Sequence, residues 1–155
     1  FGRLNPSHPH SWDFVDQPLV YQAFYGGQYG QDGVQVKWLA PTDLFLEFGA
    51  ETGNGGEFPG TRLGRNGLNG ATLFTHVGGD LGDSIGWRAG LSWTDLDAED
   101  RAYEDVDSLG NDVVNSFTGG SETWMVDATL KWTPASSNSL TPILSIGFLW
   151  LRVRL

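Results

Sequence analysis

The 155-residue sequence contains no cysteine, so a disulfide framework and a thiolate metal site are both excluded. Basic residues are also scarce. Nine Lys and Arg stand against nineteen Asp and Glu, which gives a net charge of −10. A nucleic-acid partner is not expected for a chain with a negative net charge. No apolar run reaches roughly 18 residues, which excludes a transmembrane helix.

Catalytic signals are weak as well. The phosphate-binding pattern G-x-x-x-x-G-K-[ST] and the zinc-protease pattern H-E-x-x-H are both missing. Ser84, Asp83 and His76 supply the residue types of a hydrolytic triad, but closeness in sequence does not establish geometry. We therefore expect no enzyme. The chain begins at Phe1 rather than Met, so we expect its true start, and any export signal, to lie upstream.

Glycine and aromatic residues are abundant instead, with 22 Gly, 7 Trp and 9 Phe. This composition favours strands and turns over helices. Apolar residues recur at every second position in six segments, which predicts strands with one apolar face and one polar or small face. These segments are residues 34–38, 44–50, 71–77, 85–93, 124–132 and 144–150, with 19–25 as a candidate seventh strand.

The predicted connections alternate in length. Short links fall at residues 40–43, 78–83 and 133–138, and long loops are expected at 52–70 and 95–121. Short turns at one end and long loops at the other are the layout of outer-membrane β-barrels. Strands of about 9–11 residues also match a tilted transmembrane strand.

The polar faces combine Gly, Ser and Thr with charges of both signs, which suits the water-filled interior of a barrel. Such an interior predicts that Arg is tolerated at Gly90 but not at the apolar Leu91. Tryptophans near the strand ends suit interfacial girdles. The candidate pore-lining residues are Lys37, Glu47, Arg88, Asp127 and Lys131. The alternatives are cross-strand charge pairs that merely fill the interior, and a soluble sandwich with Trp in its core.

The number of predicted strands indicates an incomplete barrel. Closed barrels of this class have at least about eight strands, and an open edge in lipid leaves backbone groups unsatisfied. We therefore predict an all-β fold: an antiparallel up-and-down transmembrane β-barrel, present as an open fragment of about 6–7 strands. Residues 1–155 form one partial domain, with an irregular, lumen-facing segment at 1–17 and strands and loops at 18–155.

The opening of the chain carries a family resemblance. Phe1-Gly2-Arg3-Leu4-Asn5 is followed by a His-containing segment and by Asp16-Gln17-Pro18-Leu19. This resembles Gram-negative outer-membrane barrels described as porins or as zinc-regulated, TonB-linked receptors, and residues 26–43 are similar to that group too. The resemblance covers roughly the first 50 residues. It implies an outer-membrane location, although nothing here resembles the plug domain of a TonB-dependent receptor.

Two clusters are candidate metal sites. His8, His10 and Asp13 offer ligands suited to Zn²⁺, with His76 as a fourth from a neighbouring strand. The alternative is a proline-braced segment whose histidines hydrogen-bond locally. The acidic stretch 95–112 offers carboxylates for Ca²⁺, but its spacing does not match an EF-hand. A solvated, mobile loop is the favoured interpretation of that stretch.

These observations predict a channel for diffusion of small polar solutes or ions in the outer membrane. It requires no cofactor, is surrounded by outer-membrane lipid, and is a candidate homo-oligomer. One alternative is an outer-membrane receptor for a metal or metal chelate, coupled to a TonB system. The other is a soluble secreted β-sandwich that binds glycans.

Overall fold

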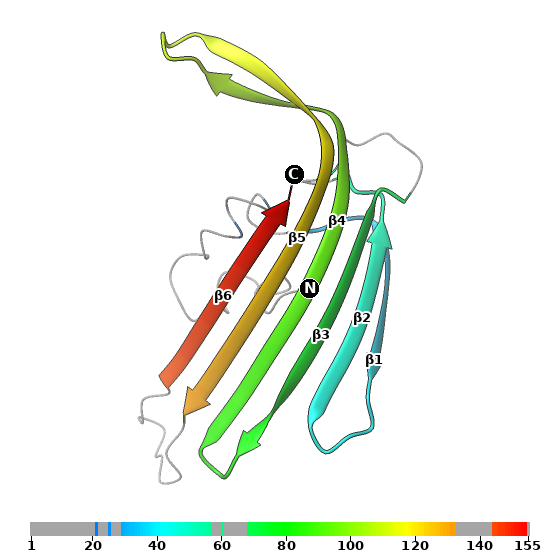
Figure 1. Ribbon diagram of the computed structural model, residues 1–155, viewed down its shortest axis with the longest axis vertical. Helices are drawn as coiled ribbons and strands as arrows, with labels where there is room; N and C mark the ends of the chain where they lie inside the picture. Colours follow the sequence, from blue (N-terminus) through cyan, green and yellow to red (C-terminus); the bar gives the residue numbers. More distant parts are fainter. Residues whose placement is uncertain are drawn as a thin grey trace.

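The computed structural model describes residues 21, 25, 29–56, 60, 68–132 and 144–154, and its strands form one open antiparallel sheet. The strands follow one another in chain order across the sheet (Figure 1). No helix among these residues is long and apolar enough to span a bilayer. The predicted all-β, up-and-down arrangement is confirmed for six strands: β1 (Gly33–Leu39), β2 (Phe45–Gly53), β3 (Gly70–Leu81), β4 (Ile85–Val106), β5 (Asp112–Trp132) and β6 (Leu144–Arg154).

The candidate seventh strand at 19–25 is wrong where the structure describes it, because Tyr21 and Tyr25 are helical. With Tyr29 they form a stripe of buried rings, each at most 4% exposed. Ring centroids lie 6.1 Å apart for Tyr21 and Tyr25, and 5.8 Å apart for Tyr25 and Tyr29. A spacing of four residues places side chains on one helical face, which a search for period-two alternation does not detect. We call these three residues the tyrosine stripe.

The predicted long loop at 95–121 is also wrong, because β4 and β5 continue through it as a paired hairpin. This arm projects beyond the other strands and bends away from them (Figure 1). The register shifts between Ala98 and Arg101, and Asp100 there adopts a positive φ of 52°. Such a bulge bends the strands that contain it. A hairpin that projects from the sheet has no face packed on a core, so strict apolar alternation is not required of it.

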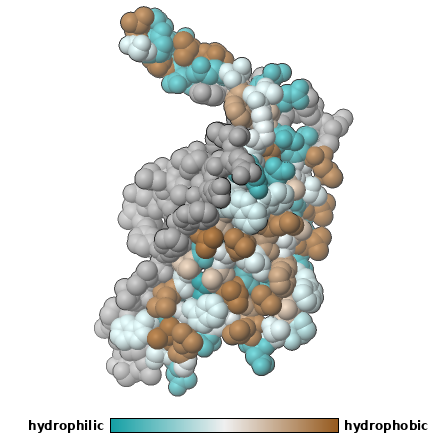
Figure 2. Space-filling view, in the orientation of Figure 1, coloured by the Kyte–Doolittle hydropathy of each residue, from teal (hydrophilic) through white to brown (hydrophobic). Residues whose placement is uncertain are grey.

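The two faces of the sheet differ sharply in exposure. On one face Thr72 and Thr94 are 0% exposed and Ser92 is 1% exposed. On the other face Leu73 is 52% exposed and Val36 is 64% exposed. We call these the covered face and the open face. Figure 2 shows apolar side chains over the strands below the arm, and hydrophilic ones around the base of the arm. The small polar residues are therefore buried, and the large apolar residues lie at the surface.

The covered face is packed mainly by aromatic rings. The buried apolar cluster consists of the tyrosine stripe with Phe74, Leu96 and Met125. The Phe74 ring lies against Gly49 on the neighbouring strand, where a Cβ atom would overlap the ring. Glycine at position 49 is therefore required by the close approach of this ring.

We expect Gly49→Val to destabilise the protein by about 1–3 kcal/mol, because the new side chain must displace the buried Phe74 ring. The free energy of unfolding of the intact protein in detergent, measured by denaturant titration, checks this. Phe74→Ala is the partner variant. Because it removes the clash, the double variant should lose less than the sum of the two single losses. If the losses of unfolding free energy in the two single variants simply add in the double variant, the Gly49→Val side chain does not overlap the Phe74 ring.

Candidate functional site

Strand register places the charged candidates together. Glu47 pairs with His76, Arg88 pairs with Thr129, and these positions alternate with open-face residues along each strand. All five residues that the alternation assigned to the polar face lie on the covered face: Lys37, Glu47, Arg88, Asp127 and Lys131. Whether they line a pore remains a prediction.

A hollow of about 700 Å³ brings four of the five together. Lys37, Glu47, Arg88 and Lys131 line it, and Asp80 adds a second carboxylate. We call it the charged hollow. Asp127 does not line it. This carboxylate is 7% exposed and lies against Gly90, where a Cβ atom would meet both Asp127 and the His76 ring. The expectation of open space at Gly90 is therefore wrong.

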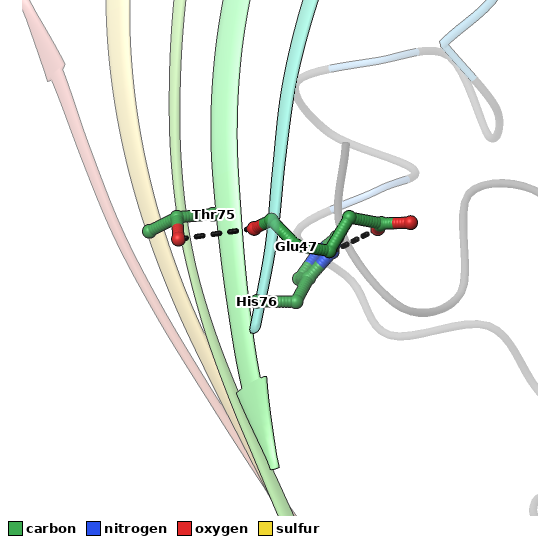
Figure 3. A network of polar contacts seen from close by, with 3 residues as sticks. All are labelled: Glu47, Thr75 and His76. Carbon is green, nitrogen blue, oxygen red and sulfur yellow. Dashed lines mark hydrogen bonds and ion pairs between the residues drawn. The ribbon is translucent and has the colours of Figure 1, made fainter. Parts of the chain in front are cut away.

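Glu47 and His76 form the best-defined polar contact of the covered face. Glu47 Oε1 lies 3.0 Å from His76 Nδ1 (Figure 3). A carboxylate only accepts hydrogen bonds, so Nδ1 carries the proton. His76 is 3% exposed, and its Nε2 atom has no hydrogen-bond partner among the residues that the structure describes. On the open side of the same strands, the Thr75 hydroxyl donates to the Glu47 carbonyl oxygen at 3.1 Å.

The tyrosine stripe lies over a row of threonines. Thr72 Oγ1 donates to Thr94 Oγ1 at 3.5 Å, and Thr94 pairs with Thr123 on β5. Burial raises the pKa of Tyr25, with the hydroxyls of Thr123 and Thr94 acting in the opposite direction. Burial likewise raises the pKa of Tyr29. Both phenols are therefore neutral at physiological pH, and the carboxylate beside them on the covered face is Glu51, which pairs with Thr72 and also raises the pKa of Tyr29.

The candidate zinc cluster falls mostly outside the described residues, which do not include His8, His10 or Asp13. The fourth candidate, His76, already engages Glu47 through Nδ1. Within the part of the chain that the structure describes, no three His, Cys, Asp or Glu side chains are arranged to hold a metal ion. The zinc site thus remains a prediction about the opening segment.

The acidic stretch 95–112 is not a loop but the arm and its turn. Asp107 organises that turn: its carboxylate accepts from the backbone N–H groups of Leu109 and Asn111 at 2.8 and 2.9 Å. It also accepts from the Asn111 amide at 2.9 Å. These hydrogen bonds, the Asn111 side chain first, lower the pKa of Asp107. This carboxylate therefore has a structural role, and a Ca²⁺ site among the remaining carboxylates of the stretch stays a prediction.

Residues 82–86 match the spacing G-x-S-x-G, which in α/β-hydrolases turns a strand into a helix and exposes the serine. Here the turn at 82–84 joins β3 to β4, two antiparallel strands. The surroundings of Ser84 are therefore those of a hairpin turn rather than of a nucleophile elbow.

The open face carries an apolar band of limited height. On β4 it spans residues 85–93, and on β5 residues 124–132, after which Asp95 and Glu122 face each other. Trp93 and Trp124 pair at this boundary with ring centroids 6.4 Å apart. Both indole N–H groups donate to Glu122 Oε1, at 3.0 and 2.9 Å. The band therefore ends in aromatic rings whose polar atoms point to a carboxylate.

Within the band lies an apolar hollow of about 830 Å³. Trp38 and Phe48 stack at one side of it, with ring centroids 5.8 Å apart. Its main lining residues are Trp38, Phe48, Leu73, Leu91, Trp93 and Trp124. Sequence reasoning missed Glu122 as the polar end of the band. The sequence does contain a signal for it: Glu122 lies two residues before Trp124, and residues two apart on a strand share a face.

Comparisons with known proteins give little to define a family. No family model matches the chain, and no solved structure matches it. A stretch of 51 residues is 55% identical to part of an uncharacterized protein of Aquifex aeolicus (strain VF5). The match covers 33% of this chain and 11% of that protein, so the similarity spans a small part of each.

We expect His76→Phe to destabilise the intact protein by about 1–3 kcal/mol, because it leaves the Glu47 carboxylate without its donor in a partly buried position. Thr75→Val is the matched control on the adjacent, open-face position. It removes a part-buried hydrogen bond between two uncharged groups and should cost about 1 kcal/mol. Denaturant titration measures the loss of unfolding free energy in both variants. A larger loss in Thr75→Val than in His76→Phe would contradict the prediction.

Proposed function

We propose that this sheet is part of the wall of an outer-membrane β-barrel through which small polar solutes or ions pass. The observation that supports it is the inverted burial of the two faces: small polar residues are buried and large apolar residues are exposed. A soluble protein that left this many large apolar side chains at its surface would be prone to association. In a bilayer the same surface faces acyl chains, and no such cost arises.

The dimensions of the apolar band support the membrane proposal. Nine residues, 85–93, cross the band on β4, and a tilted transmembrane strand has about 9–11. Trp93 and Trp124 sit at the boundary with their N–H groups on Glu122. Tryptophan favours this depth because its ring is apolar and its N–H needs a polar partner. The arm then lies beyond the bilayer.

A soluble β-sandwich is less well supported. A sandwich buries its apolar face against a second sheet. Among the described residues that face is exposed, and the packed cluster lies on the opposite, polar face. The free edges of β1 and β6 fit the barrel proposal, because each pairs with a further strand when a barrel closes. The receptor alternative differs from a channel only by a plug domain, and no described residue bears on it.

Single-channel recording of the intact protein in a planar bilayer tests the proposed function. Stable conductance steps are the expected result, since the covered face then borders an aqueous path. Insertion without conductance would favour a plugged receptor. A protein that stays in the aqueous phase without detergent would overturn the membrane proposal altogether.

We further expect Leu91→Arg to destabilise the protein in lipid by about 2–4 kcal/mol, because it places a charge on the lipid-facing side of the band. Gly86→Arg is the matched control. Gly86 lies on the covered face beside the charged hollow, and a Cβ atom added there would have Asp80 Oδ1 as its nearest neighbour, at 3.4 Å. Unfolding in lipid vesicles compares the two, and equal losses would refute the proposed orientation of the faces.

A further inference from the structure

We propose that the charged hollow binds small oxyanions, namely solutes that carry a carboxylate or a phosphate. This inference rests on the proposed function, because it names the class of solute that the passage favours. Three cationic side chains from three strands converge on the hollow: Lys37 from β1, Arg88 from β4 and Lys131 from β5. They are all the Lys and Arg side chains that the structure describes, in a chain of net charge −10.

None of the three cations is committed to a carboxylate in the part of the chain that the structure describes. Glu47 instead accepts a hydrogen bond from His76 Nδ1. Arg88 Nε is buried and has no hydrogen-bond partner among the described residues. Lys37 Nζ lies 5.5 Å from the centroid of the Phe74 ring, a cation–π contact that positions the ammonium without neutralising it. Three positive groups are thus held at one hollow with free hydrogen-bonding capacity.

Each of these cations has a glycine as its cross-strand neighbour. Lys37 pairs with Gly49, Arg88 with Gly78 and Lys131 with Gly86. At Gly86, opposite Lys131, the missing side chain leaves space above the sheet, whereas at Gly49, opposite Lys37, the Phe74 ring occupies that space. Arginine binds carboxylate and phosphate groups through two parallel hydrogen bonds, while lysine acts as a point charge. The combination suits an oxyanion better than a neutral solute.

The carboxylates nearby do not cancel this preference. Glu47 and Asp80 line the hollow, so its lining holds three positive groups against two negative ones, while the buried Asp127 carboxylate lies outside the lining, two residues along β5 from Thr129. The many acidic residues of the arm are remote. From Arg88 to Asp97 the strand runs nine residues, or about 30 Å at 3.3 Å per residue. Screening in physiological salt acts over about 8 Å. The charges of the hollow itself therefore decide which ion it attracts.

Reversal potentials of the intact protein in a potassium chloride gradient test the selectivity. We expect the sign that indicates preference for chloride over potassium, and a shift toward potassium in the triple variant Lys37→Gln, Arg88→Gln, Lys131→Gln. Ser108→Asp in the turn of the arm is the control, since it makes the net charge more negative far from the hollow. A wild-type channel that prefers potassium, or an equal shift in the control, would overturn the inference.

Binding of inorganic phosphate, measured by equilibrium dialysis of the detergent-solubilised protein, gives a readout that needs no conductance. We expect saturable binding to weaken by about tenfold or more in Arg88→Gln, since a hydrogen bond to a charged group contributes about 1.5–3 kcal/mol. Circular dichroism confirms that the variant is folded. Phosphate binding without conductance would leave the anion site standing and remove the proposed passage. Conductance with phosphate binding absent, or unchanged by Arg88→Gln, would remove the anion site and leave the passage.

Discussion

Every functional feature of this sheet depends on the register of its strands. Side chains alternate between the two faces, so a slip of one residue between β4 and β5 would exchange the faces of one strand against the other. It would bring Arg88 to the apolar band and Leu91 beneath the covered face. The long ladder from Ile85 paired with Trp132 to Val106 paired with Asp112 makes such a slip costly, because nearly all its hydrogen bonds would have to be remade. The hydrogen bonds from Trp93 and Trp124 to Glu122 further favour this register, because both indole N–H groups share one acceptor.

The covered face meets a second constraint, which is the space that charged side chains need. Buried charges are costly unless they are partnered or reach a polar space. Glycine gives one such side chain room, as at Gly90 beside Asp127, whose carboxylate oxygens are buried and have no hydrogen-bond partner among the described residues. Where no charge is present, aromatic rings fill the face, as Phe74 does over Gly49. Single glycines thus decide where, along the same strands, a charged side chain or an aromatic ring can lie against the sheet.

Alternation in the sequence predicted the six strands and the face on which each charged candidate lies, because a period of two is a local property. Alternation did not predict the segments whose structure has another periodicity or depends on contacts between residues distant in sequence. Residues 95–121 project from the sheet and need no apolar face, so their strands carry little alternation. Tyr21 and Tyr25 follow a helical spacing inside a segment short enough to pass for a strand. The Glu47–His76 contact and the shared hollow of Lys37, Arg88 and Lys131 join residues distant in sequence, and their geometry depends on register that no local pattern encodes. The opening segment, with its candidate zinc ligands, stays a prediction.

The covered face divides into two zones along the strands, and their order bears on how a solute would travel. Toward the arm lie the threonine row and the tyrosine stripe, which are rich in hydroxyl groups and have the Glu51 carboxylate beside Thr72. Toward the tight turns lies the charged hollow. On β4 the change from Arg88 to Ser92 takes four residues, or about 13 Å. A solute crossing the first zone would exchange water for hydroxyl groups, which accommodate either sign of charge. Selection of anions would then arise in the second zone, where Lys37, Arg88 and Lys131 line the hollow. A passage arranged in this way separates the removal of water from the selection of the ion.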